Sequence, residues 1–186
     1  KADIPCGCTL LGLSAIPTAH PLNKGMLGMH GNLAPNIKTN ECDVLIAVGM
    51  RFDDRVTGNL ATYAKQAKII HLDIDPSEFN KNVKVDIPVL GDCKKTLTKL
   101  IGYIKENKHT EWIDSFVEHA QTEYARVIEK EVYPKEGPLN MGEVVRAVSE
   151  ATAHEAILVT DVGQNQMMAA RYFKYTQSRS VVTSGG

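Results

Sequence analysis

Charged residues follow an apolar run at one point of the sequence, in the stretch VGMRFDDRVTG. A glycine ends the run, and four charged residues come directly after it: Arg51, Asp53, Asp54 and Arg55. Arginine suits phosphate because its fork of donors contacts two oxygens at once, and glycine lets a ligand approach the backbone closely. The pattern is typical of a loop that meets an anionic ligand. Pairing of the four charges among themselves, in a solvated turn, is the alternative.

Acidic and glycine residues also end the next two apolar runs, at Asp73 to Asp75 and at Gly91-Asp92-Cys93. Asp73 stands 24 residues after Gly49, near the separation at which an acidic residue accepts ribose hydroxyls in dinucleotide folds. Ligands of open α/β sheets bind beyond the carboxyl ends of the strands. These features fit an adenine dinucleotide with its pyrophosphate near the arginines, although no G-x-G-x-x-G occurs and Asp75 can instead cap a helix at Pro76.

A third candidate is the stretch VTDVGQNQ, which reads as a strand end, a glycine and a helix start. Free N–H groups at a helix N-terminus favour phosphate, and Gly163 permits close approach. Gln164 and Asn165 can donate further hydrogen bonds from their side chains. An ordinary turn capped by Asp161 or Asn165 is the equal alternative.

Other reactive side chains form no recognisable constellation. His30, in GMLGMHG, lies in a glycine-rich loop where its ring could stack on a ligand or face water. The four cysteines (6, 8, 42 and 93) lack the paired spacing of a zinc site, so we expect reduced, packed thiols and no metal. No G-x-S-x-G elbow is present, and no nucleophile stands out.

The elements that must position these residues alternate between strand and helix. Short β-branched runs predict strands at 4–12, 42–49, 67–75 and 85–92, with helices at 32–41, 58–66 and 75–82. A loop rich in Pro and Gly spans 14–31. This rhythm predicts the α/β class with a Rossmann-like parallel sheet, and continuous apolar strands suggest that both faces of it are covered.

A helical region follows. Apolar residues at steps of three and four between Trp112 and Ile128 predict an amphipathic helix that serves packing and linkage. The break YPKEGP ends it, and Asn140 with Glu143 can cap the next helix. A strand at 156–163, a helix at 164–173 and a strand at 179–186 follow. We therefore predict a first domain over 1–102, a helical linker over 103–137 and the start of a second α/β domain over 138–186.

Composition narrows the class of protein. The 186 residues are 43% hydrophobic and 23% charged, as in ordinary globular proteins. A net charge of −1 without a basic block argues against a nucleic-acid partner. No apolar run approaches the roughly 20 residues that span a bilayer, and the sequence contains no charged-then-apolar signal peptide. A cytosolic or organelle-interior protein is expected.

Four motifs in order carry a resemblance: GMLGMHG, VGMRFDDRVTG, HLDIDPSEFNKN and DVGQNQMMAARY followed by TSGG. Across its whole length the chain resembles the catalytic-subunit family of acetohydroxyacid synthase, also called acetolactate synthase. The resemblance implies an enzyme that decarboxylates pyruvate on thiamine diphosphate and condenses it with a second 2-ketoacid, pyruvate or 2-ketobutyrate, in branched-chain amino acid biosynthesis. It also implies a central FAD domain that lacks its first strand and helix, followed by the start of the thiamine diphosphate-binding domain.

The resemblance assigns residues to each ligand. Those implied for FAD, which has no net redox role in the family, are Leu27, Gly28, Met29, His30, Gly31, Gly49, Arg51, Asp53, Arg55, Val56, Asp73, Ile74, Gly91 and Asp92. Arg55 resembles the arginine that binds the carboxylate of the second ketoacid, and Met29 and Asp54 match positions near the substrate channel. Gly163, Gln164 and Asn165 resemble the segment that holds the diphosphate, where many members carry histidine at position 165.

Other parts of the family's machinery are expected outside this chain. The activating glutamate belongs to an N-terminal domain, and the Gly-Asp-Gly segment that binds Mg²⁺ would follow Gly186, so the chain alone is expected to be inactive. A homo-oligomer, dimer or tetramer, would cover the sheet edge left by the missing strand. A regulatory small subunit and a bacterial cytoplasmic location are further expectations. The alternatives are a non-catalytic dinucleotide-binding module or another thiamine diphosphate enzyme, such as pyruvate oxidase or glyoxylate carboligase, against which RFDDRVTG argues.

Overall fold

The computed structural model describes residues 1–184, which divide into two compact units. The first unit combines Lys1–Asp3 with Asn36–His109, and the second combines Ile4–Pro35 with the chain from Thr110 onward. Neither unit is therefore continuous in the sequence. The predicted domain boundaries after residues 102 and 137 stay predictions.

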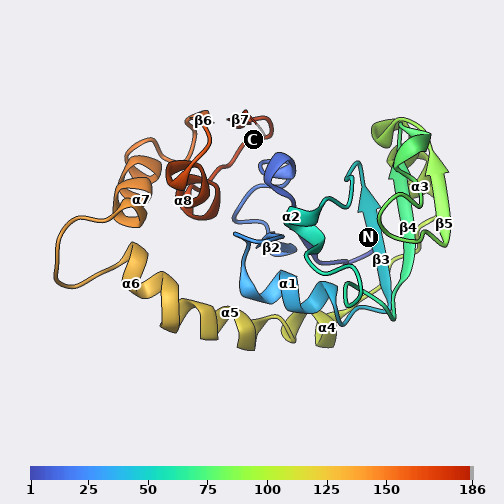
Figure 1. Cartoon of the computed structure of the whole chain (residues 1–186), viewed down its shortest axis with the longest axis horizontal. Coiled ribbons are helices and arrows are strands. Elements are labelled where there is room, and N and C mark those ends of the chain that lie inside the picture. Colours follow the sequence, from blue (N-terminus) through green and yellow to red (C-terminus); the bar gives the residue numbers. More distant parts are fainter. Residues whose placement is uncertain (185–186) are drawn as a thin grey trace. The chain divides into compact units, whose positions relative to one another are not determined.

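The first unit contains a parallel sheet of three strands in the order β3-β4-β5 (Figure 1). Its strands are β3 (Val44–Val48), β4 (Lys68–Asp73) and β5 (Ile87–Leu90). All three lie inside the predicted strands, and the parallel α/β architecture is confirmed. Their carboxyl ends lie at one edge, because Val48 is opposite Leu72 and Asp73 is opposite Leu90.

The core of this unit covers the central strand. Ala47 and Ile69 form a buried cluster with Phe52, Tyr63, Ala64 and Val85. The outer strands remain partly open, since Val48, Ile87 and Leu90 are 41–62% exposed. The expectation of cover on both faces, which concerned the runs at 42–49 and 67–75, fits the largely buried β4 but is wrong for the ends of β3, where Val44 and Val48 are exposed. A continuous apolar run indicates that a strand tends to be buried, but it does not show which other elements bury it.

The helices of the first unit are short apart from α3 (Cys93–Tyr103). The helix predicted at 58–66 is wrong: α2 spans Asp54–Thr57, and turns follow it. Asp53 caps α2 by accepting a hydrogen bond from the backbone of Arg55 at 3.0 Å, and Gly58 ends it with φ 57°. The short helix at Pro76 is confirmed as a 3-10 turn, η2 (Pro76–Glu78), capped by Asp75.

The second unit contains two small parallel sheets. One pairs β1 (Cys6–Cys8) with β2 (Asn23–Met26), and the other pairs β6 (Leu158–Thr160) with β7 (Val181–Thr183). Helix α8 (Gln164–Tyr172) connects β6 to β7. The strand β2 falls inside the predicted loop 14–31, because its residues, NKGM, carry no strand propensity.

The remaining helices follow one another along the chain, and α1 crosses the boundary between the units after Pro35. After the 3-10 turn η1 (Leu10–Gly12) comes α1 (Leu33–Thr39), which tolerates Pro35 because the first turn needs no donor there. The predicted amphipathic helix is interrupted by a turn at 115–116, which separates α4 (Thr110–Asp114) from a continuous helical run. That run consists of α5 (Val117–Glu123), the π-helical η3 (Tyr124–Ile128) and α6 (Glu129–Val132). Helix α7 (Met141–Ala151) begins with the predicted capping box of Asn140 and Glu143.

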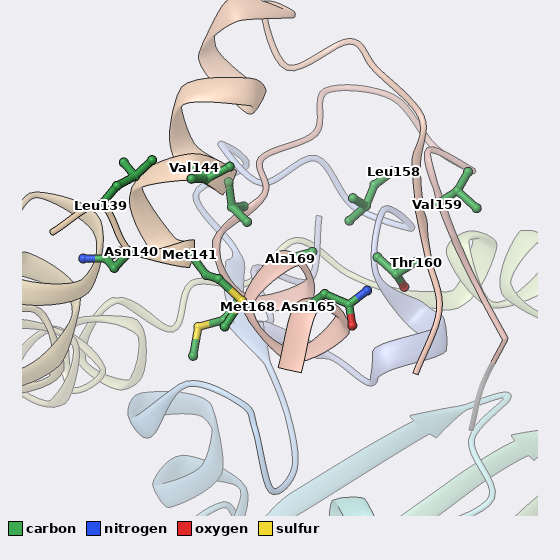
Figure 2. A pocket seen from close by; sticks show the side chains of 11 residues that line it. Leu139, Asn140, Met141, Val144, Leu158, Val159, Thr160, Asn165, Met168 and Ala169 are labelled. Carbon is green, nitrogen blue, oxygen red and sulfur yellow. The ribbon is translucent and has the colours of Figure 1, made fainter. Parts of the chain in front are cut away.

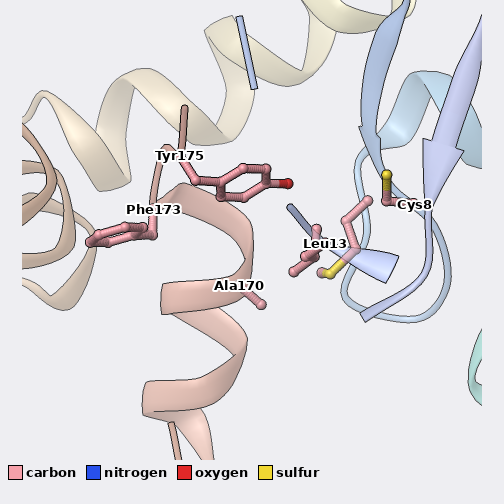
Figure 3. Close-up of a cluster of buried hydrophobic side chains, with 6 residues drawn as sticks. Cys8, Leu13, Ala170, Phe173 and Tyr175 are labelled. Carbon is pink, nitrogen blue, oxygen red and sulfur yellow. The ribbon is translucent and has the colours of Figure 1, made fainter. Parts of the chain in front are cut away.

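A buried cluster joins the first strands to α8 (Figure 3). Ala170 on α8 packs with Leu13, and the cluster also contains Cys8, Met26, Phe173 and Tyr175. All four cysteines are free, and burial raises the pKa of the Cys8 thiol. Residues almost 170 positions apart therefore share one core.

Candidate functional site

The predicted glycine positions meet at one edge of the sheet in the first unit. The amide of Gly49 donates to the carbonyl of Leu72 at 2.8 Å, and the amide of Gly91 donates to that of Asp73 at 2.9 Å. Gly49 has φ 60°, a conformation that favours glycine. A Cβ at position 49 would lie 3.6 Å from the sulfur of Cys93, so the loops after β3 and β5 are neighbours.

The loop after β3 is anchored by a residue that the sequence analysis did not select. Phe52 is buried although its φ is 53°, and its ring makes edge contacts with Tyr63 and His71 at centroid distances of 6.2 and 5.0 Å. Two side chains bind carbonyls of the loop: His71 Nε2 lies 2.9 Å from the oxygen of Met50, and Asn82 Nδ2 donates to that of Phe52 at 3.0 Å. The backbone of the loop is therefore held from inside.

The charged side chains of the same loop point to solvent. Arg51 and Arg55 are exposed, and Arg55 Nε lies 3.9 Å from Asp54 Oδ1 with both side chains at least 75% exposed. Such a pair is weak in water. Asp53 serves as the cap of α2, and Val56 is half-buried. Pairing within the turn thus occurs between Asp54 and Arg55, whereas Asp53 caps the helix and both guanidinium groups stay exposed to an anion.

The acidic residues at the other strand ends have structural partners of their own. Asp73 is buried, and its Oδ1 accepts the amide of Asp75 at 2.9 Å while Oδ2 lies 3.6 Å from His71 Nε2. Asp92 caps α3 by accepting the amide of Lys95 at 2.9 Å. Ile74 is exposed between them. A ribose hydroxyl at Asp73 would have to use the lone pairs that these contacts leave.

The glycine loop Leu27–Gly31 belongs to the second unit, whereas Arg51 and Asp73 belong to the first. Its base is closed by Asn32, whose amide donates to the carbonyl of Met26 at 2.8 Å and whose Oδ1 accepts the amide of Met26 at 2.9 Å. Leu27 is half-buried and Gly28 is buried, but Met29 is 64% exposed and His30 is also exposed. The loop therefore presents two side chains on a closed base.

The start of α8 is a helix N-terminus without a side-chain cap. Gly163 is the N-cap residue, with φ 137° and no side chain to cap the helix. Gln164 and Asn165 are exposed, and a Cβ at position 163 would lie 3.1 Å from Asn165 Oδ1. The N-terminal amides and the helix dipole favour a negatively charged group at this position.

An open pocket of about 400 Å³ lies between α7, β6 and α8, and the sequence analysis missed it (Figure 2). Asn165 belongs to its wall, so the pocket begins beside the first turn of α8. Figure 2 shows apolar side chains from all three elements around it, and the residues involved are Leu139, Asn140, Met141, Val144, Val145, Leu158, Val159, Thr160, Asn165, Met168 and Ala169. Apolar residues on both sides of a predicted turn were the signal that could have found it.

Other side chains in the described chain have structural roles. Ser149 Oγ lies 2.9 Å from His154 Nδ1, yet Ser149 is buried and also accepts the amide of Lys174, so it is no nucleophile. Within residues 1–184, no cluster of three or more His, Cys, Asp or Glu could hold a metal ion. Over the same residues, no helix has the length and apolar character to cross a membrane.

Comparisons with known proteins identify the family of the chain. Residues 1–100 match the family described as thiamine pyrophosphate enzyme, central domain; thiamine pyrophosphate is another name for thiamine diphosphate. The chain is 43% identical to a probable acetolactate synthase large subunit of Methanocaldococcus jannaschii over 98% of its own length and 32% of that protein. It is 41% identical to the acetolactate synthase large subunit of Lactococcus lactis, over all of this chain and 32% of that protein.

A third relative is the large subunit of acetolactate synthase isozyme 3 of Escherichia coli, which is 36% identical over 99% of this chain and 32% of that protein. The chain thus spans about a third of the length of the curated relatives that it matches. The family match covers more than half of the chain. The chain therefore belongs to the thiamine pyrophosphate enzyme family, and its first hundred residues match the central domain of that family.

Proposed function

We propose that this chain is part of an acetolactate synthase large subunit, which condenses decarboxylated pyruvate with a second 2-ketoacid in branched-chain amino acid biosynthesis. The observation that carries the proposal is the loop after β3. It holds Arg51 and Arg55 in solvent at the carboxyl edge of a parallel sheet, where anionic ligands of α/β folds bind. The names of three relatives, at 36–43% identity, support the same reaction.

In this proposal the flavin lies along the sheet edge. Gly49 and Gly91 let the flavin approach the protein backbone closely, and Arg51 contacts the pyrophosphate of the flavin. Asp53, Val56 and Ile74 complete its surroundings in the first unit, with Asp73 and Asp92 on the adenosine side. The resemblance also assigns the loop Leu27–Gly31, in the second unit, to FAD. Arg55 binds the carboxylate of the second ketoacid, because an exposed guanidinium can contact both carboxylate oxygens. Asp54, and Met29 of the second unit, are the other residues that the resemblance assigns to the substrate.

The thiamine diphosphate site begins at α8. Gly163, Gln164 and Asn165 offer backbone and amide donors to the diphosphate, and Gly163 provides no side chain that would compete with it. Thiamine diphosphate, when bound, supplies the nucleophilic carbon that decarboxylation of a 2-ketoacid requires. The activating glutamate and the Mg²⁺ ligands are proposed to come from other parts of the full protein, and the chain by itself is proposed to be inactive.

The assembly around the chain is also proposed from the family. The full protein forms a homo-oligomer, a regulatory small subunit binds it, and both work in the cytoplasm. The names of the relatives, which are called large subunits, support a smaller partner.

A binding experiment tests the flavin site without requiring turnover. FAD is titrated against the full protein and against Arg51→Gln, with Arg126→Gln as a control at an exposed arginine outside the site. Loss of a charge-assisted contact should weaken FAD binding about tenfold in Arg51→Gln and leave the control unchanged. Equal affinities in all three proteins would contradict the assignment.

Alkylation of Cys93 provides a second measurement. Burial raises the pKa of this thiol, and the charges of Asp73 and Asp92 raise it further, so the reaction must be followed at alkaline pH. FAD at the sheet edge should slow alkylation of Cys93 and leave Cys6, in the other unit, unaffected. Formation of acetolactate by the full protein, and its absence with this chain alone, tests the activity.

A further inference from the structure

A buried ion pair contacts the exposed loop Leu27–Gly31. Glu123, at the end of α5, pairs with Arg171 on α8, and their side chains are only 5% and 18% exposed. The same carboxylate accepts the amide of Leu33 at 3.0 Å and lies 3.4 Å from Asn32 Nδ2. One acidic side chain therefore joins α8 to the segment that closes the loop.

Arg171 also reaches the loop directly. Its NH1 group donates to the carbonyl of Gly31 at 3.1 Å and lies 3.4 Å from that of His30. The side chains of Met29 and His30 stay exposed while these carbonyls are held. A guanidinium group suits this geometry because it is planar and carries several donors in fixed directions.

The loop cannot easily relax around these contacts. A Cβ at Gly31 would lie 2.3 Å from the carbonyl oxygen of Met26, and one at Gly25 would lie 2.3 Å from Asn32 Oδ1. The base is therefore closely packed, against the backbone of Met26 at Gly31 and against the side chain of Asn32 at Gly25. A change in the direction of the His30 and Gly31 carbonyls has to occur at the exposed tip, the position that Arg171 controls.

Stability alone does not explain the pair. Removing two charges from water is unfavourable, and apolar residues of equal size often stabilise a fold as well as a buried ion pair does. The pair fixes orientations, because Glu123 holds the guanidinium group of Arg171 and this group holds the carbonyls of His30 and Gly31. The arrangement is that of a side chain that orients others.

We propose that Arg171, held by Glu123, is a positioning residue that sets the conformation of the Met29–His30 tip for ligand binding. The nature of the ligand, flavin and ketoacid, rests on the proposed function. Helix α8 then serves both candidate sites: its first turn carries Gly163 to Asn165, and Arg171 lies about two turns further on. The tip and the diphosphate segment are thereby attached to one rigid element.

The test compares four variants of the full protein. Arg171→Met removes the donors, and Arg171→Met/Glu123→Gln also removes the acidic charge, so that no unpaired buried carboxylate prevents folding. Arg171→Lys keeps a charge and partly restores the contacts. Arg146→Gln is the matched control, because Arg146 likewise joins a backbone carbonyl, that of Val132, to a carboxylate, that of Glu150, and touches no residue of the loop.

Two measurements are made on each variant. Hydrogen exchange of the amides of residues 29–31, with the methyl NMR signal of Met29, reports the order of the tip without any ligand. Both Arg171→Met proteins should exchange about tenfold faster than wild type. Arg171→Lys should lie between these variants and wild type, and Arg146→Gln should equal wild type. FAD affinity should fall in the same order.

The outcomes separate this inference from the proposed function. A folded double variant with wild-type exchange at residues 29–31 overturns the positioning role, whatever the flavin does. Faster exchange in a protein whose wild type binds no FAD supports the positioning role and refutes the flavin assignment. Faster exchange with unchanged FAD affinity shows that the tip does not serve the ligand, which also overturns the inference.

Discussion

Replacement of Phe52 tests how the loop after β3 is held. The side chain is buried, and truncation of a buried phenylalanine to alanine destabilises a fold by about 3–5 kcal/mol. Its two edge contacts, with Tyr63 and His71, contribute about 0.5–1.5 kcal/mol each within that total. Phe52→Ala should therefore lose several kcal/mol of unfolding free energy.

The backbone of Phe52 adds a sharper expectation. Its φ of 53° is disfavoured by about 1–2 kcal/mol for residues that carry a Cβ, and alanine keeps that strain. Phe52→Gly removes both the ring and the strain, so it should be about 1 kcal/mol more stable than Phe52→Ala, the reverse of the order at an ordinary position.

The measurement should report on the first unit alone. The single tryptophan, Trp112, lies in the second unit, so its fluorescence is unsuitable. Hydrogen exchange of the amides of β3 and β4 under increasing urea gives the required free energies. If Phe52→Gly proves equal to or less stable than Phe52→Ala, the left-handed backbone and the anchoring role assigned to this residue are refuted.

Three further predictions concern the second unit. Asn140→Ala breaks the capping box of α7 and should lower the free energy of unfolding by about 1 kcal/mol in urea denaturation, whereas Asn140→Asp should stay near wild type. Burial and the hydrogen bond to Glu131 raise the pKa of Tyr172 to about 12, from 10 when unfolded, so its contribution to stability is complete below pH 10 and is lost as the pH rises toward 12. The fall in melting temperature over that range should be smaller in Tyr172→Phe. Gly163→Ala puts a Cβ at φ 137° and should destabilise by about 1 kcal/mol and weaken thiamine diphosphate binding, measured by calorimetry; unchanged binding would argue against a diphosphate there.

Local signals in the sequence predicted the elements that depend on local physics. The strands of the first sheet follow from continuous β-branched runs, and the caps at Asp75 and Asn140 follow from side chains that bond the next amides. The errors come from competition between such signals. Asp53 and Gly58 define a helix one turn before the predicted one, and β2 is a strand only because β1 pairs with it.

The sequence predicted where the candidate residues lie in the fold, but not which side chains hold them in place. The glycines and charges at the sheet edge and at α8 lie where strand ends and helix starts put them. The residues that hold them come from far along the chain: His71 binds the carbonyl of Met50, and Glu123 binds Arg171, 48 positions away. No periodicity connects such pairs, so only the folded chain identifies them.

The interleaving of the two units decides how this protein can be divided in the laboratory. The chain passes between units after Asp3, after Pro35 and after His109. A piece cut at residue 102 would carry Cys8, Leu13 and Met26 without the C-terminal side chains that shield them from water. We expect such a piece to aggregate on expression unless the rest of the chain is produced in the same cell.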